Sequence, residues 1–307
     1  MVPRPGPPYP RRASVALAVA LATFRPQDHI GAVDRDLPDL ARGVGAAGAT
    51  ARVAYWDDPD VDWGAYDLVL IRSTWDYIEH VAEFTAWAGR VASVTRLANP
   101  ADVVRWNADK RYLGELTAAG VPTVPTAYAA PGSGAEPDLP AGEFVIKPTV
   151  GGGSHLAGRY GPGEHAAARA HLARLDAEGL TAMVQPYMSR IDTTGERALI
   201  FFGGHYRHAI RKGPVLTPGT AYDADKTSHP DVRAWQPTDA ELALAERALA
   251  AVPGALELLY ARVDLVDGDD GAPHVMELEL IEPNLFLDVH PESLPVVAEL
   301  IVKAAGQ

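Results

Sequence analysis

The sequence predicts an α/β protein with a parallel sheet in its first hundred residues and antiparallel strands in its last third. In residues 13–100, short apolar runs alternate with segments whose apolar residues recur at helical spacing, and this alternation is typical of a parallel sheet with right-handed crossovers. Residues 197–211 and 261–282 each hold two apolar runs around a glycine-containing turn, which is typical of hairpins. A length of 307 residues, at roughly 100–200 residues per domain, suggests two domains or one with subdomains.

The first predicted strand covers residues 13–23, whose continuous apolar run suits a strand buried on both faces. The same run could be the apolar region of a signal peptide, because Arg11 and Arg12 precede it. We favour the strand, since a chain without cysteine gives secretion no support. Residues 1–12, rich in proline and arginine, are predicted to be a disordered leader. The next elements expected are a helix, two strands and a helix, at 37–48, 49–56, 67–73 and 79–94.

The middle of the chain is predicted to alternate helices and strands around a loop rich in proline and glycine at 130–142. The expected elements are helices at 109–119 and 164–179 and strands at 143–147 and 181–187. The apolar face of the earlier helix at 79–94 would consist of Val81, Phe84, Trp87, Val91 and Val94. We expect unit boundaries that give the regions 1–12, 13–100, 101–184 and 185–307.

Composition excludes several classes of function. Forty acidic residues against 27 Lys and Arg give a formal charge of -13, and no basic block exists to attract a phosphate backbone, so nucleic-acid binding is disfavoured. The absence of cysteine excludes disulfides, thiolate metal sites and cysteine nucleophiles. No run approaches the roughly 18 apolar residues that a membrane span needs. We therefore expect a cytoplasmic protein without a membrane or nucleic-acid partner, and a homo-oligomer stays open.

A phosphate-binding loop is predicted where the strand 143–147 ends in Lys147 and is followed by Gly151, Gly152, Gly153 and Ser154. Glycines expose backbone N–H groups without obstruction, and the neighbouring ammonium adds positive charge, so together they can hold phosphate oxygens. The alternative is a solvated lysine beside a mobile loop. Three glycines directly after a strand lysine favour the phosphate interpretation.

A second candidate site is acidic. Asp264 lies in one apolar strand, and Glu277 and Glu279 share a face of the strand across the turn. Carboxylates crowded on one face would repel one another unless a cation neutralised them, and oxygen ligands suit Mg²⁺. Removing one carboxylate should then raise the stability of the metal-free protein. The alternative is an edge hairpin with a solvated acidic face. Arg262 shares the face of Asp264 and would contact a substrate anion or, alternatively, form a salt bridge to one of the glutamates.

These motifs together resemble the ATP-grasp ligases over residues 100–305. The resemblance lies in Lys110 of WNADKRYL, Lys147 of VIKP, VQPYM at 184–188, the R-x-D of Arg262 and the E-x-E of Glu277. It implies that ATP lies between two α+β subdomains, with the two lysines on its phosphates and the acids on Mg²⁺ or Mn²⁺. It also implies an adenine-binding hinge and a ribose contact, from Gln185, Pro186, Tyr187, Met188 and Asp192. Glu279 departs from the asparagine usual in the family.

Three segments, YWDDPDVDWGAYDLVLIRSTWDY (55–77), NPADVVRWNADKRYL (99–113) and MELELIEPNLFLDVHPES (276–293), are similar to one subgroup of ATP-grasp ligases. This subgroup includes the ligase that cyclises O-ureido-D-serine to D-cycloserine. That resemblance implies a small amino-acid-like substrate activated as an acyl phosphate. The substrate would be held by the first unit through Arg72, Ser73, Thr74 and Trp75, with Arg262, Lys212 and Arg211 as catalytic residues. An intermolecular ligase of the dipeptide type, a non-catalytic ATP-binding regulator and a secreted binding protein stay open as alternatives.

Overall fold

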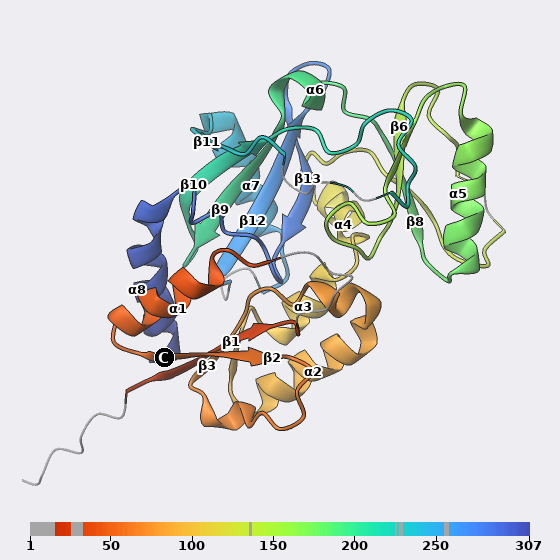
Figure 1. Ribbon diagram of the computed structural model, residues 1–307. Helices are drawn as coiled ribbons and strands as arrows, with labels where there is room; N and C mark the ends of the chain where they lie inside the picture. Colours follow the sequence, from red (N-terminus) through yellow and green to blue (C-terminus); the bar gives the residue numbers. More distant parts are fainter. Residues whose placement is uncertain (1–15, 26–32, 135–136, 225, 227–229, 255–257) are drawn as a thin grey trace, which may run out of the picture.

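The computed structural model describes residues 16–25, 33–134, 137–224, 226, 230–254 and 258–307. Its strands form three sheets, which Figure 1 shows as a lower sheet, a central upper sheet and a smaller sheet to the right. The predicted leader at 1–12, and the two arginines of the signal-peptide alternative, lie outside the described residues. No helix in the described part of the chain is long and apolar enough to cross a membrane.

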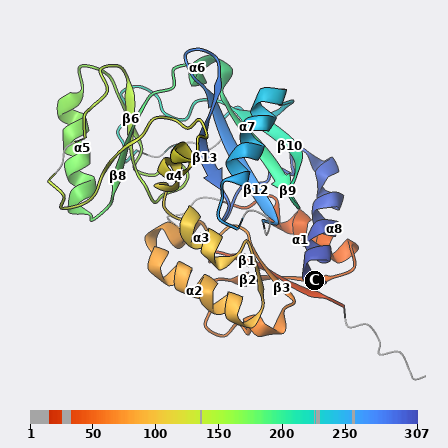
Figure 2. The same cartoon turned by 180° about the vertical axis from the view of Figure 1, so that it is seen from behind.

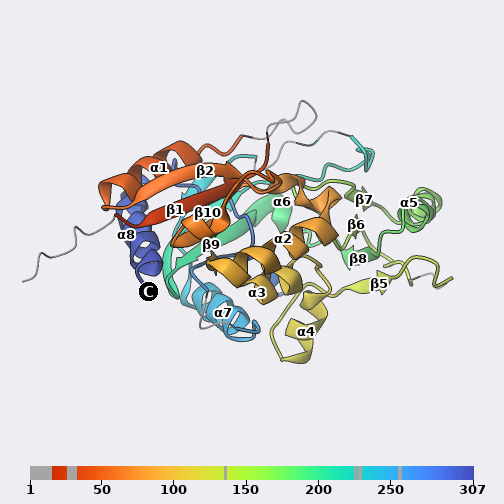
Figure 3. The ribbon, with the colours of Figure 1, turned by 90° about the horizontal axis from the view of Figure 1, so that it is seen from below.

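The first sheet is parallel, with the order β2-β1-β3-β4. Its strands are β1 (Ala18–Thr23), β2 (Thr50–Tyr55), β3 (Leu68–Ile71) and β4 (Arg96–Ala98). Helices α1 (Leu37–Ala46) and α8 (Leu294–Ala305) cover one face, and α2 (Val81–Val94) covers the other (Figure 3). The central strands β1 and β3 are therefore buried on both faces, which explains their continuous apolar sequences.

The second sheet is antiparallel and has the order β5-β8-β6-β7. Its strands are β5 (Ala127–Ala129), β6 (Phe144–Pro148), β7 (Gly158–Tyr160) and β8 (Ala182–Pro186), and helix α5 (His165–Ala177) packs against it. Helices α3 (Ala101–Asn107) and α4 (Tyr112–Ala118) connect this sheet to the first (Figure 1). Lys147 is the fourth residue of β6, and the glycine loop follows the strand directly.

The third sheet is antiparallel, with the order β11-β10-β9-β12-β13. It consists of β9 (Glu196–Phe202), β10 (His205–Lys212), β11 (Arg233–Trp235), β12 (Tyr260–Asp267) and β13 (Pro273–Glu279). Gly203 and Gly204 both have positive φ in the two-residue turn between β9 and β10, as a type I′ turn requires. Helix α7 (Asp239–Ala250) covers one face of this sheet (Figure 2), and the short helix α6 (Ile191–Thr194) precedes it.

Two cores join elements that are distant in the sequence. The first contains residues of β1, α1 and α8 together with residues of β9 and β10, so the last helix packs against the first unit. The second lies between α7, α4 and the third sheet. Residues 122–124 pair with Val275 of β13 and so attach the second sheet to the third.

The parallel first sheet and both predicted hairpins are confirmed, while short and terminal elements differ. Helix α4 begins at Tyr112 rather than 109, and α3 before it was not expected. Helices α6, α7 and α8 and the strands β4, β5, β7 and β11 were also not expected. In α2, Phe84, Trp87 and Val91 are buried as predicted, but Val94 is 60% exposed, because the helix ends there and the chain turns toward β4. The expected unit boundaries stay a prediction.

Candidate active site

Two adjoining cavities lie between the second and third sheets. The first, of about 110 Å³, is polar, and the second, of about 80 Å³, has a larger apolar share in its lining. Both are lined by Lys147, Ser154 and Glu196, so they form one continuous site. The first cavity is also lined by six further charged residues of the predicted site, namely Lys110, Lys212, Arg262, Asp264, Glu277 and Glu279, and by Gly151, Gly152 and Gly153.

Lys110 is positioned by hydrogen bonds that the neighbouring side chains of Asn107 and Tyr112 make with the backbone of the edge strand β13. Asn107 donates to the Leu278 carbonyl at 2.9 Å and accepts from the Leu280 amide at 2.9 Å, while the Tyr112 hydroxyl pairs with both backbone groups of Leu278. These bonds satisfy the outer edge of β13 and hold the Lys110 ammonium 3.1 Å from a Glu277 carboxylate oxygen. Lys110 also donates to the Gly151 carbonyl, which ties it to the glycine loop.

Lys147 points into both cavities. Burial, together with the like charges of Lys110 and Lys212, lowers the pKa of Lys147, although Glu277 and Glu196 oppose that shift. Among the described residues no hydrogen bond or ion pair to its ammonium is found. A desolvated lysine beside exposed glycine amides is well placed to bind an anion such as a phosphate group.

Arg262 and Asp264 form the centre of a buried charge network. The guanidinium of Arg262 donates two bonds to the Asp264 carboxylate, at 2.8 and 2.9 Å, and a third to Glu279. Lys212 donates to Asp264 at 2.9 Å and lies 2.7 Å from a Glu196 oxygen. Burial alone would raise the pKa of Asp264, but Arg262 and Lys212 outweigh it and hold that pKa well below its usual range.

One nitrogen of this network stays available. Nη1 of Arg262 is buried and has no hydrogen-bond partner within the part of the chain that the structure describes. Because unpaired buried N–H groups are costly, this nitrogen is a candidate contact for an oxygen of a bound ligand. The predicted alternative, a salt bridge from Arg262 to Glu279, is present too, and the two roles are compatible because they use different nitrogens.

The register of the hairpin places Asp264 opposite Glu277 and Arg262 opposite Glu279, as the strand pattern predicts. The three carboxylates do not form a ready-made metal site, however, and none is found among the described residues. Both oxygens of Asp264 accept from cations, so attraction by Arg262 and Lys212 opposes the predicted repulsion, and the effect of removing Asp264 on stability stays a prediction.

Among the described residues Glu277 pairs with one cation, Lys110, and Glu279 with one, Arg262, whereas Asp264 pairs with two, so the glutamates fit a divalent cation better than Asp264 does. Burial raises the pKa of Glu279 to about 7. The negative charges of Asp264 and Glu277 also raise this pKa, whereas the positive charges of Arg262 and Lys212 lower it. Burial, and then Glu279, raises the pKa of Glu282 to about 8. Ionisation of such carboxyl groups is disfavoured in the metal-free protein, and a hard cation would favour the charged form, for which oxygen donors suit Mg²⁺ or Mn²⁺. The metal assignment stays a prediction.

The second cavity contains the predicted hinge. Gln185, Pro186, Tyr187 and Met188 all line it, together with Val124, Val145, Ile191, Val215, Leu216 and Met276. Asp192, the predicted ribose contact, is not among these lining residues. Its Oδ1 accepts from the Tyr187 hydroxyl at 2.6 Å and its carboxylate pairs with Arg159. The ribose role of Asp192 stays a prediction.

Two sets of predicted residues lie outside the cavities. Arg211 is adjacent to Lys212 on β10 and therefore projects to the opposite face, where it donates to the carbonyls of Thr194 and Thr193 at the end of α6. A catalytic role for Arg211 does not fit this position.

The predicted substrate residues follow β3 and contact the segment after β13. Arg72 donates to the Pro283 carbonyl at 3.2 Å and pairs with Asp34, and Trp75 donates to the Glu282 carbonyl at 3.2 Å. The Ser73 hydroxyl pairs with Thr23, while the buried hydroxyl of Thr74 has no partner among the described residues. These four residues adjoin the acidic end of the site without lining either cavity, and their substrate role stays a prediction.

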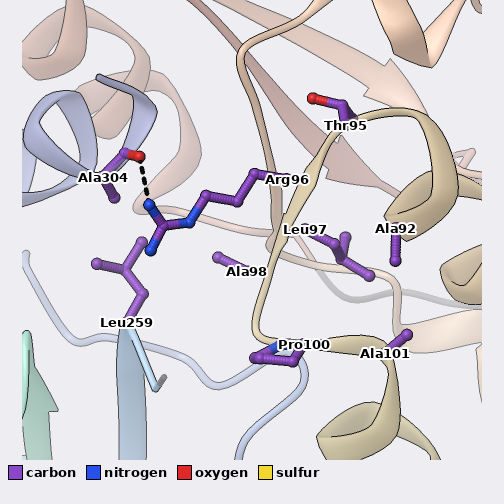
Figure 4. Close-up of a pocket in the computed structure, with 9 residues that line it drawn as sticks. All are labelled: Ala92, Thr95, Arg96, Leu97, Ala98, Pro100, Ala101, Leu259 and Ala304. Carbon is purple, nitrogen blue, oxygen red and sulfur yellow. Dashed lines mark hydrogen bonds between the residues drawn. The ribbon is translucent and has the colours of Figure 1, made fainter. Parts of the chain in front are cut away.

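Sequence reasoning missed Glu196, Met276 and Arg159. Glu196 precedes a predicted strand and pairs in register with Lys212, so the hairpin pattern could have revealed it. Arg159 lies on the three-residue strand β7, which carries no sequence signal. A separate cavity of about 340 Å³ lies beside β4 and the end of α8 (Figure 4). Arg96 in its lining donates to the Ala304 carbonyl at 2.9 Å, and the remaining lining residues carry no charge.

Comparisons with known proteins agree with this architecture. Residues 19–99 match the family model described as the N-terminal domain of D-cycloserine synthetase DcsG. The cycloserine biosynthesis protein DcsG of Streptomyces lavendulae is 43% identical over 273 residues, which cover 83% of this chain and 89% of that protein.

Solved structures give the same result. The crystal structure of D-cycloserine synthetase DcsG matches with a TM-score of 0.82 and 39% identity, over 94% of this chain and 99% of that one. A RimK domain protein of the ATP-grasp type from Sphaerobacter thermophilus matches with a TM-score of 0.64 and 17% identity, over 94% and 99%, which shows the fold alone. The chain has the ATP-grasp fold and belongs to the DcsG family of D-cycloserine synthetases.

Proposed function

We propose that this protein is an ATP-dependent ligase that cyclises O-ureido-D-serine to D-cycloserine, with ADP and phosphate as products. The observation that carries the proposal is the convergence of Lys110, Lys147, the glycine loop and the unpaired nitrogen of Arg262 on one cavity. This cavity adjoins a second one, whose more apolar lining suits a base. Membership of the DcsG family supports the substrate class.

The site would activate a carboxylate, whose oxygen is a poor leaving group until it is phosphorylated. Lys110 and Lys147 would bind the phosphates of ATP, and the glycine amides would stabilise the charge that spreads over the transferring phosphoryl group. Arg262 would bind the substrate carboxylate or the acyl-phosphate oxygens through Nη1, because its other nitrogens are held by Asp264 and Glu279. The substrate nitrogen that is bonded to oxygen would then attack the activated carbonyl, so that the ring C–N bond forms as the C–O bond to phosphate breaks. Hydrolysis of the carbamoyl group on that nitrogen, which would leave as CO₂ and ammonia, would complete D-cycloserine.

Glu277 and Glu279 would hold Mg²⁺, which would supply positive charge to the phosphate oxygens. Lys212 neutralises Asp264 together with Arg262, and Lys212 is itself paired with Glu196. Asp264 accepts hydrogen bonds from Nε and Nη2 of Arg262 and thereby fixes the direction of the third nitrogen, Nη1. Orientation of this kind is worth several kcal/mol in catalysis, as for one preorganised oxyanion donor at about 3–4 kcal/mol.

The direct test incubates the protein with ATP, Mg²⁺ and O-ureido-D-serine and follows the products by mass spectrometry. The expected result is D-cycloserine with stoichiometric ADP and phosphate, and no product from a Lys147→Met variant. AMP with pyrophosphate would contradict activation through an acyl phosphate. A panel of D- and L-serine derivatives distinguishes the rivals, because a dipeptide product would identify an intermolecular ligase. ATP binding without phosphate release on the whole panel would identify a regulator.

A further inference from the structure

Arg159 contacts neither the phosphate end nor the acidic end of the site, so binding of phosphate or metal does not explain why an arginine is buried there. It lies on β7, is 8% exposed, and does not line either cavity. We infer that Arg159 is a positioning residue for the nucleoside: it holds Tyr187 and Leu216 in the arrangement that forms the base end of the nucleotide site. This inference rests on the nucleotide site of the proposed function.

The guanidinium of Arg159 contacts four separate parts of the chain. Its central carbon lies 3.5 Å from the centroid of the Tyr187 ring, so the two planar groups are in contact. One terminal nitrogen donates to the Leu216 carbonyl at 3.3 Å. The other donates to Glu143 at 2.8 Å and to Asp192 at 3.3 Å. One side chain thus connects the start of β6, the hinge after β8, helix α6 and the segment after β10.

Tyr187 and Leu216, the two residues that Arg159 holds, are the ones that would contact a bound nucleotide. Tyr187 and Leu216 line the second cavity, whereas Arg159, Glu143 and Asp192 stand behind them. Tyr187 is further restrained at both ends, since its amide donates to the Glu143 carbonyl at 2.8 Å and its hydroxyl donates to Asp192. The effect of Arg159 on a nucleotide would therefore pass through Tyr187 and Leu216.

A stability role alone does not account for this arrangement. The carboxylate side chains of Glu143 and Asp192 are 40% and 43% exposed, and ion pairs with partners this exposed contribute little to folding. The planar fork of arginine, by contrast, can bind several acceptors at once while stacking on a ring, and lysine cannot. Arg159→Lys should therefore fold while losing the geometry around Tyr187.

The test compares two probes by titration calorimetry: ADP, which fills both cavities, and inorganic tripolyphosphate, which needs only the phosphate end. In Arg159→Lys we expect the dissociation constant of ADP to rise about tenfold or more, while that of tripolyphosphate changes less than twofold. The KM for ATP should rise in parallel, with kcat at saturating ATP and the KM for the amino-acid substrate nearly unchanged. Arg174→Lys, on the exposed face of α5, is the matched control and should alter none of these values.

Tyr187 variants provide an independent arm. Tyr187→Phe keeps the ring on Arg159 and loses only the bond to Asp192, so it should weaken ADP less than Tyr187→Leu does. Because Arg159 also acts through Leu216, the double variant Arg159→Lys with Tyr187→Leu should lose less ADP affinity than the sum of the two single losses. Additive losses, an unchanged ADP affinity in Arg159→Lys, or equal losses for ADP and tripolyphosphate would each overturn the inference. A wild-type protein that binds tripolyphosphate but not ADP would overturn the proposed function as well.

Discussion

Asp264 lies between two buried cations, and its replacement by asparagine should destabilise the protein even when no nucleotide or metal is bound. The carboxylate is 2% exposed and accepts two bonds from Arg262 and one from Lys212. Asparagine preserves the shape, but it removes the negative charge and turns an N–H₂ group toward one of the cations. The change therefore leaves two positive side chains close together with one counter-ion fewer.

The loss of stability in Asp264→Asn depends on which carboxylate partners Arg262 and Lys212 keep. Breaking a buried ion pair by removing one partner costs about 3–5 kcal/mol. Arg262 would still pair with Glu279, and Lys212 would still pair with Glu196. Since neither cation loses its last carboxylate, the cost should lie near the lower limit, at about 3 kcal/mol of unfolding free energy.

The measurement is urea denaturation of the metal-free protein, followed by tryptophan fluorescence and circular dichroism so that two-state behaviour is checked. Asp102→Asn is a suitable control, because Asp102 is 92% exposed in its ion pair with Arg105 and should change stability by less than about 0.5 kcal/mol. Asp264→Asn should lower the urea midpoint clearly below that of the wild type and the control.

An unchanged or higher midpoint in Asp264→Asn would refute the reasoning. That result would mean that Asp264 is repelled by its carboxylate neighbours more than it is attracted by Arg262 and Lys212, as expected for an empty three-carboxylate metal site. It would return Asp264 to the set of metal ligands and leave the orientation of Arg262 unexplained.

Three further results are expected. Arg262→Lys should lower kcat by one to several orders of magnitude, roughly 2–4 kcal/mol, with ADP affinity in calorimetry unchanged; full turnover would move Arg262 out of the substrate site. Glu277→Gln should raise the Mg²⁺ concentration for half-maximal activity about tenfold or more, and full activity at limiting Mg²⁺ would exclude it as a ligand. Because burial and then Glu279 raise the pKa of Glu282 to about 8, the folded state keeps a proton that the unfolded chain loses near pH 4.5. The stability of the metal-free protein should therefore fall between about pH 5 and 8, and urea midpoints of Glu282→Gln should fall less; an equal fall would contradict the shift.

Much of the architecture is predictable because it depends on local patterns. The buried strands of the first sheet, the Gly203-Gly204 turn and the hairpin that pairs Asp264 with Glu277 all follow from apolar periodicity and turn chemistry. The placement of Lys147 before the glycine loop is equally local, since a strand and its next few residues are fixed relative to each other. Short elements such as β7 are not predictable in this way, because three residues form a strand only when they hydrogen-bond to the backbone of a neighbouring strand, here β6.

The sequence by itself determined which charged residues share a strand face, and the tertiary structure decided which of them meet. Arg262, Asp264 and Glu279 were placed together by strand alternation alone. Lys212, which pairs with Asp264, comes from β10, and Lys110, which pairs with Glu277 of the same hairpin, comes from the segment before α4. Only the packing of these elements brings the two lysines to the acids. Arg159 contacts Glu143, Tyr187, Asp192 and Leu216, at separations of up to 57 residues. Ion pairing depends on distance and desolvation, and both are properties of the folded chain rather than of any segment within it.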